Sequence, residues 1–155
     1  MRVNGIHHVT LLVDDEERAA WFYGEVLGLK EKSRPSFKFP GIFYTSGNQE
    51  IHIIIASRPL SYEDLYIDIG GVSDITRRHI HRHVALAVSD SDGLEARLEE
   101  NGVEILFGPN RVEPDDELSR NMINGWMRMY GGVPVFCLDP FKNLVELVPT
   151  RFERE

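Results

Sequence analysis

The segment HVTLLVDD at residues 8–15 is closely matched by a second segment, HVALAVSD, at residues 83–90. In each copy a histidine precedes an apolar run typical of a β-strand, and a helix-like stretch follows. The repeat indicates one structural unit built twice, with a potential metal ligand, His8 or His83, at the start of each copy.

Periodicity and turn signals predict a related plan in both units, with a strand, then a helix, then further strands. The elements expected in the first unit are a strand at 3–13, a helix at 14–28 and strands at 36–46 and 49–57. The elements expected in the second unit are a strand at 79–88, a helix at 92–101 and strands at 103–107, 126–130, 133–138 and 143–148. Two stretches rich in Gly, Pro, Asp and Ser, 58–78 and 108–125, are expected to be loops.

This pattern predicts an α+β protein with two tandem β-α-β-β-β modules. No flexible linker separates them, so we expect a single domain over residues 1–155. Module one spans about 3–57, a connecting loop spans 58–78 and module two spans about 79–150. Two such sheets can curl together around a common cavity.

Composition limits the classes of partner. The net charge of -8 argues against nucleic acid or an anionic membrane surface, since either needs a dominant positive field. No segment approaches the roughly 18 consecutive apolar residues that span a bilayer. We therefore expect a cytoplasmic protein that acts on a small molecule. The single cysteine, Cys137, lies in an apolar run and is expected to be a buried structural thiol.

A charged residue interrupts the last strand of the second unit. Glu146 stands between Val145 and Leu147, where an uncompensated carboxylate is costly to bury. The matching position of the first unit, between Ile51 and Ile53, holds His52. An ionisable residue therefore occurs at this place in both units.

Residues of metal-ligand type thus form two symmetric pairs, His8 with His52 and His83 with Glu146. Three imidazoles and one carboxylate suit Zn, Ni, Co, Mn or Fe(II) better than Mg or Ca, which prefer oxygen ligands. An open coordination position would make such a site catalytic. Any one of these histidines alone is explained as a core or edge residue, but the symmetry of the set favours a metal.

The chain resembles the vicinal oxygen chelate superfamily, which includes glyoxalase I, methylmalonyl-CoA epimerase, extradiol dioxygenases, fosfomycin-resistance enzymes and bleomycin-binding proteins. The resemblance covers nearly the whole chain. The segments that carry it are GIHHVTLLV at 5–13, FYGEVLGLK at 22–30, EIHII at 50–54, RHVALAV at 82–88 and DPFKNLVEL at 139–147.

The resemblance implies a cupped sheet around one divalent metal, with ligands from the first and last strands of each module. Carried over by motif, the ligands are His8, His52, His83 and Glu146. Relatives of glyoxalase type usually have Glu or Gln in place of His52, which makes Glu50 the alternative fourth ligand. Lys142 stands where the family usually has Gly, so it either alters the turn or places a cation near the rim.

The function that the resemblance implies is proton transfer on a substrate with vicinal oxygens, through a metal-stabilised enediolate. Glu146 is then the expected base, with no organic cofactor, in an enzyme of lyase or isomerase type. One alternative is an Fe(II) extradiol-type dioxygenase that uses His8, His83 and Glu146. Another is a metal-free protein that binds an aromatic ligand or antibiotic. Many relatives pair across a two-fold axis, which implies a homodimer.

Overall fold

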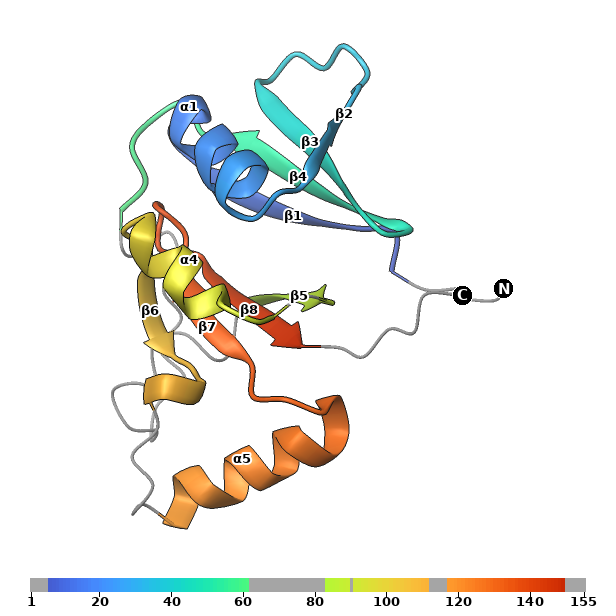
Figure 1. Ribbon diagram of the computed structural model, residues 1–155. Coiled ribbons are helices and arrows are strands. Elements are labelled where there is room, and N and C mark those ends of the chain that lie inside the picture. The colour runs from blue at the N-terminus through green and yellow to red at the C-terminus, as the bar shows by residue number, and fades with distance from the viewer. Residues whose placement is uncertain (1–5, 62–82, 90, 112–116, 150–155) are drawn as a thin grey trace. The chain divides into compact units, whose positions relative to one another are not determined.

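The computed structural model describes residues 6–61, 83–89, 91–111 and 117–149 (Figure 1). Most of the predicted 58–78 loop and the start of the predicted strand at 79–88 lie outside these residues. Within the described residues, no helix combines the length and the apolar character needed to cross a membrane.

The chain forms two compact units, each with its own four-stranded sheet. Unit one contains residues 1–72 and the short turn at 140–143, and unit two contains residues 73–139 and 144–155. Both sheets are mixed, and the strands are interleaved with helices. The predicted α+β class with two tandem β-α-β-β-β modules is confirmed.

The sheet of unit one has the strand order β1-β4-β3-β2. Strand β1 (His8–Val13) is parallel to β4 (Gln49–Ile55), which is antiparallel to β3 (Gly41–Ser46). A short strand, β2 (Lys30–Lys32), pairs with β3 at the edge. The sequence did not predict β2, because three consecutive charged residues show no apolar alternation.

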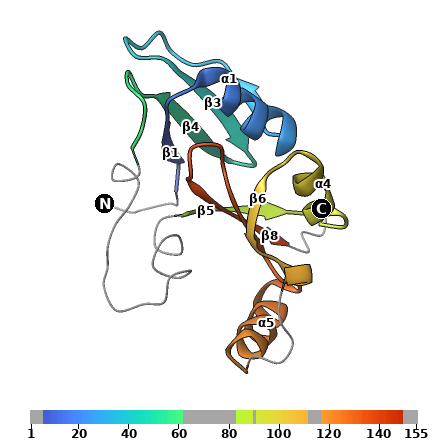
Figure 2. The ribbon, with the colours of Figure 1, turned by 90° about the vertical axis from the view of Figure 1, so that its left-hand side faces the viewer.

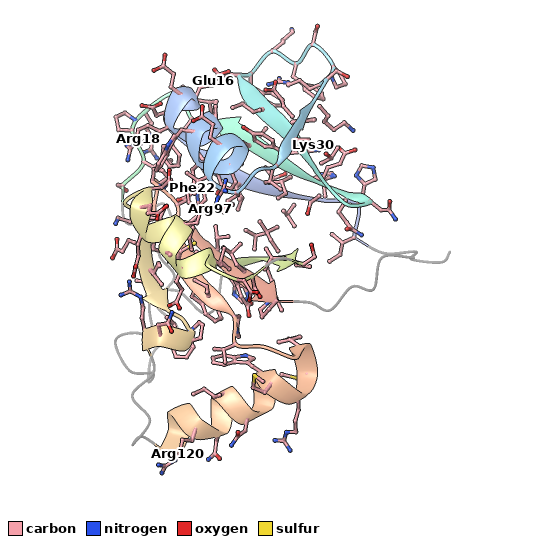
Figure 3. The ribbon with its side chains drawn as sticks, viewed as in Figure 1. Glu16, Arg18, Phe22, Lys30, Arg97 and Arg120 are labelled. Atoms are coloured by element: carbon pink, nitrogen blue, oxygen red, sulfur yellow. The ribbon has the colours of Figure 1, made fainter. Side chains whose placement is uncertain are left out.

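The helix of unit one begins with α1 (Glu16–Ala19) and continues as η1 (Ala20–Val26), lying across one face of the sheet (Figure 1). Asp15 caps it, because its carboxylate accepts the backbone N–H of Arg18 at 3.0 Å. Glu16 adds negative charge to the first turn, and its exposed side chain extends into solvent (Figure 3).

The second part of this helix is wound more widely, with the N–H of Leu27 bonded to the carbonyl of Phe22 at 3.0 Å. Phe22 and Tyr23 are fully buried. Tyr23 faces Tyr44 of β3, with their ring centroids 6.3 Å apart. This packing supports the sheet from the side opposite to His8 and His52.

The sheet of unit two repeats the plan with the order β5-β8-β7-β6. Its strands are β5 (His83–Val88), β6 (Glu104–Phe107), β7 (Val135–Leu138) and β8 (Leu144–Pro149). Strands β5 and β8 are parallel, whereas β7 is antiparallel to both β8 and β6. Helix α4 (Leu94–Glu100) connects β5 to β6 and buries Leu98 (Figure 2).

The connection between β6 and β7 differs from the prediction. Instead of a loop at 108–125 and a strand at 126–130, it contains the short helix η2 (Pro109–Arg111) and the long helix α5 (Glu117–Tyr130). Arg120 of α5 points away from the second sheet (Figure 3). The predicted strand at 126–130 is wrong. Ile123, Trp126 and Tyr130 do recur at helical spacing, but the poor helix formers Asn124 and Gly125 between them make this spacing hard to recognise.

Lys142 has a φ of 68°, the one positive value among the described residues other than glycine. A side chain in the left-handed region costs roughly 1–2 kcal/mol, a cost that glycine does not have. Lys142→Gly should therefore raise the free energy of unfolding by about 1 kcal/mol. Urea unfolding measures it, with Lys38→Gly as a control at a position without a positive φ. Equal effects of the two substitutions would contradict the prediction.

Candidate metal centre

The first predicted ligand pair lies on one face of the sheet of unit one. Thr10 of β1 pairs with His52 of β4, so their side chains point to the same side. His8 precedes Thr10 by two residues and therefore shares that face. Strand geometry thus brings His8 and His52 together.

The second pair occupies the same register positions in unit two. Ala85 of β5 pairs with Glu146 of β8, and His83 precedes Ala85 by two residues. Position by position, His83 corresponds to His8, and Glu146 corresponds to His52. The match between these positions, read from the sequence, is therefore present in the strand register.

His83 and Glu146 are in direct contact, with Nε2 of His83 3.0 Å from Oε2 of Glu146. Glu146 is only 8% exposed. Burial raises the pKa of Glu146, and the neighbouring His83 opposes this shift. A buried carboxylate beside an imidazole is a donor set that Zn, Mn or Fe(II) accepts.

His8 and His52 are stacked, with ring centroids 4.1 Å apart and planes at 13°. Phe43 covers the other face of His52 at 3.6 Å and 2°. The lone pair of an imidazole lies in the ring plane, so two parallel rings cannot both direct a nitrogen at one ion. While this stack persists, one of the two histidines can be a ligand.

Glu50 holds His52 in this position. Its Oε2 lies 2.8 Å from Nε2 of His52, and its Oε1 accepts a hydrogen bond from Nζ of Lys32. These bonds, first that of His52 and then that of Lys32, lower the pKa of Glu50 to about 2. Both carboxylate oxygens of Glu50 and Nε2 of His52 are therefore engaged in this network, so either residue would have to leave it to become the fourth ligand.

Within each unit, the described His, Cys, Asp and Glu side chains form no group of three arranged to hold a metal ion. The described contacts are a histidine stack in unit one and a histidine–carboxylate pair in unit two. A role for Lys32 was not predicted from the sequence. Lys32 lies on β2 and pairs with Phe43 of β3. Because the sequence did not predict β2, it could not show that the Lys32 side chain reaches Glu50.

Glu50→Gln should lower the melting temperature at pH 7, because it replaces a carboxylate that bonds both Lys32 and His52. The lowered pKa of Glu50 sets the pH range over which the substitution affects stability. Stability from Glu50 is complete above its unfolded pKa, near 4.3, and is lost as pH falls through the folded value, about 2. Thermal melts of variant and wild type should therefore converge near pH 2. Glu31→Gln, an exposed residue of β2, is the control; a gap that persists at pH 2 contradicts the prediction.

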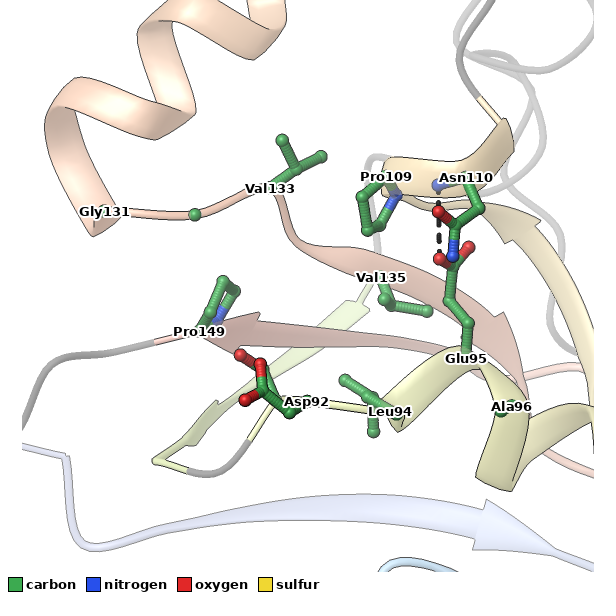
Figure 4. A pocket seen from close by; sticks show the side chains of 13 residues that line it. Asp92, Leu94, Glu95, Ala96, Pro109, Asn110, Gly131, Val133, Val135 and Pro149 are labelled. Carbon is green, nitrogen blue, oxygen red and sulfur yellow. Dashed lines mark hydrogen bonds between the residues drawn. The ribbon is translucent and has the colours of Figure 1, made fainter.

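Unit two also contains a cavity of about 330 Å³ (Figure 4). Its wall includes Glu95, which accepts the backbone N–H of Asn110 at 3.2 Å and lies 3.9 Å from Nε of Arg111. None of the predicted metal ligands lines it. The cavity is therefore separate from the candidate metal centre.

Cys137 is fully buried on β7, and burial raises the pKa of its thiol to about 12. A thiol that stays protonated at neutral pH is a poor nucleophile. The prediction of a buried structural cysteine is confirmed.

Two β-α-β-β-β modules with ionisable residues, His52 and Glu146, at equivalent strand positions define a duplicated scaffold. The sequence matches the family described as the Glyoxalase/Bleomycin resistance protein/Dioxygenase superfamily over residues 5–147. The chain belongs to this superfamily, and the resemblance to the vicinal oxygen chelate proteins is confirmed.

Solved structures share the fold over almost the full chain. A glyoxalase family protein from Bacillus anthracis is 24% identical, with coverage of 97% of this chain and 98% of that one and a TM-score of 0.62. A fosfomycin resistance protein, FosX, from Listeria monocytogenes, complexed with Mn(II) and 1S,2S-dihydroxypropylphosphonic acid, is 16% identical (97% and 95% covered, TM-score 0.63). Lactoylglutathione lyase from Agrobacterium tumefaciens is 18% identical (96% and 95% covered, TM-score 0.57).

Proposed function

We propose that this chain is a divalent-metal-dependent enzyme that moves a proton on a small substrate with two adjacent oxygen atoms. The reaction is of glyoxalase or epimerase type. The observation that carries the proposal is the buried contact between His83 and Glu146. Family membership supports it, and so do the Mn(II) and the vicinal diol that accompany the FosX structure.

The residues present fit a divalent ion. Two ligands that are each about 2.1 Å from one ion lie about 3 Å apart, and the atoms of His83 and Glu146 are separated by 3.0 Å. A cation also offsets the cost of burying the Glu146 carboxylate. We propose that His8, His83 and Glu146 hold the ion, with His52 as fourth ligand once its bond to Glu50 and its stack on His8 are both released.

When bound, the ion supplies Lewis-acid polarisation of a substrate oxygen. Glu146 accepts the proton from the substrate carbon next to the carbonyl and returns it. In the absence of the ion, His83 positions the carboxylate through its Nε2 contact.

Metal analysis of the purified protein, before and after reconstitution with Zn, Ni, Co, Mn or Fe(II), tests the proposal. We expect one ion per chain and a higher melting temperature with the ion. Failure of every ion to bind stoichiometrically would overturn it. Oxygen uptake with catechol and Fe(II) would instead indicate a dioxygenase, and a ligand-induced thermal shift of metal-stripped protein without turnover would indicate a binding protein.

A further inference from the structure

One face of the sheet of unit two carries aromatic side chains in a row that leads to Glu146. Phe107 of β6 pairs with Phe136 of β7, and Phe136 pairs with Glu146 of β8. Paired residues of neighbouring strands point to the same face. Both rings therefore lie on the face that carries His83 and Glu146.

Helix α5 adds a third ring to this face. The ring of Trp126 lies 5.1 Å from that of Phe107 and 6.1 Å from that of Phe136. Phe136 is in turn 6.2 Å from the imidazole of His83. Phe107, Trp126 and Phe136, here called the aromatic cluster, are all only partly buried. The cluster therefore retains accessible ring surface next to the predicted ligand pair.

The space beside the cluster is not filled from β5. Ala85, the partner of Glu146 in the next strand, is small and exposed. On the β5 side, a ring stacked on the cluster can thus lie within reach of His83 and Glu146 without displacing a large described side chain.

The corresponding positions of unit one have the opposite character. Lys32 pairs with Phe43 where Phe107 pairs with Phe136, and Glu50 pairs with His8 where Leu144 pairs with His83. The ligand face of unit one is charged at these two places, whereas that of unit two is aromatic and apolar. Phe43 is the counterpart of Phe136, so both units have a ring at that position, but only in unit two is this ring paired with a second phenylalanine on the neighbouring strand.

We infer that the aromatic cluster is a binding subsite for an aromatic ring of the substrate. The substrate class is then an aromatic compound with two adjacent oxygens on its side chain. This assignment rests on the proposed function for the oxygen-binding part. Recognition of the ring depends only on Phe107, Trp126 and Phe136.

Three small acids with the same pair of vicinal oxygens test the inference: mandelate, its saturated analogue hexahydromandelate, and lactate. The chain has two tryptophans, so Trp21→Phe leaves Trp126 as the fluorescent reporter inside the cluster. When the Trp21→Phe variant has been reconstituted with Mn(II), added mandelate should change the fluorescence of Trp126 in a saturable way. It should bind about two- to tenfold more tightly than hexahydromandelate, the range expected for one aromatic pair.

Phe107→Leu keeps an apolar side chain but removes one ring of the cluster, and should abolish the preference for mandelate. Phe39→Leu is the matched control, since it removes an exposed ring of unit one and should leave the preference unchanged. Circular dichroism and thermal melts check the fold of both variants. Trp126→Leu, measured by calorimetry, gives a second test if Phe107→Leu fails to fold.

Equal affinities for mandelate and hexahydromandelate, or no saturable response to mandelate, would overturn the inference. The same titrations after metal removal separate it from the proposed function. A preference for mandelate that survives without metal supports the subsite even where the metal analysis fails. Stoichiometric metal without this preference leaves the proposed function standing and rejects the aromatic substrate class.

Discussion

Glu146→Gln is expected to reduce metal affinity by at least about a hundredfold, more than the loss of a residue that only supports a ligand. The amide keeps the shape of the side chain but lacks the charge that binds the ion. The same substitution should raise the melting temperature of metal-free protein at pH 7, because the amide can still hydrogen-bond to His83 but avoids the cost of burying a charge. Metal titration by calorimetry and thermal melts of stripped protein measure the two effects.

The opposite signs of these effects make the experiment specific. A purely structural Glu146 would show a lower melting temperature and no change in metal content. His83→Ala should also abolish metal binding, although it leaves the carboxylate without its partner and so should lower stability. His81→Ala, a histidine outside the predicted ligand set, is the control and should retain the full metal content.

His52→Ala separates the two possible ligand sets. In the structure, Nε2 of His52 is bonded to Glu50 and its ring is stacked between Phe43 and His8. If His8, His83 and Glu146 suffice, this variant keeps stoichiometric metal and loses only part of the affinity. Complete loss would show that His52 leaves Glu50 to become a full ligand.

The architecture was predictable because it depends on a repeated pattern. A histidine before an alternating apolar run marks the first strand of each module, and a charged residue within an apolar triplet marks the last. The strand register then places His52 and Glu146 at equivalent positions. These are local features of period two, which a sequence displays directly.

The elements that were missed lack such a period or conceal it. Strand β2 is three charged residues at a sheet edge, where no face needs to be apolar. Helix α5 contains Asn121, Asn124 and Gly125, all poor helix formers, and is held by the packing of Trp126 on Phe107. Tertiary contacts of this kind outweigh local propensity.

The ligand pairs were predictable in position but not in conformation. The sequence does not show that His52 stacks on His8, because this depends on how Phe43 and Glu50 hold its ring. The role of Lys32 depends on a strand that was not predicted. Residue types therefore indicate the chemistry, whereas side-chain packing decides which nitrogen is available for a metal.

Gly41→Ala is expected to cause the largest loss of stability of any single methyl group added to unit one. A Cβ at Gly41 would lie 2.4 Å from the backbone carbonyl oxygen of Ile53 in the paired strand. Backbone cannot move aside as a side-chain tip can, so the start of β3 must shift away from β4. We expect a loss of about 2 kcal/mol and a fall in melting temperature of about 4–8 °C.

The effect should reach the candidate metal centre, because β3 continues from Gly41 to Phe43, which covers the ring of His52. Gly24→Ala is the matched control: its Cβ would meet Tyr44 at an ordinary 3.6 Å, and alanine favours the helix by roughly 0.5–1 kcal/mol. Urea unfolding of both variants measures the difference. Similar stabilities for Gly41→Ala and Gly24→Ala would show that β3 does not approach β4 as closely as the structure has it.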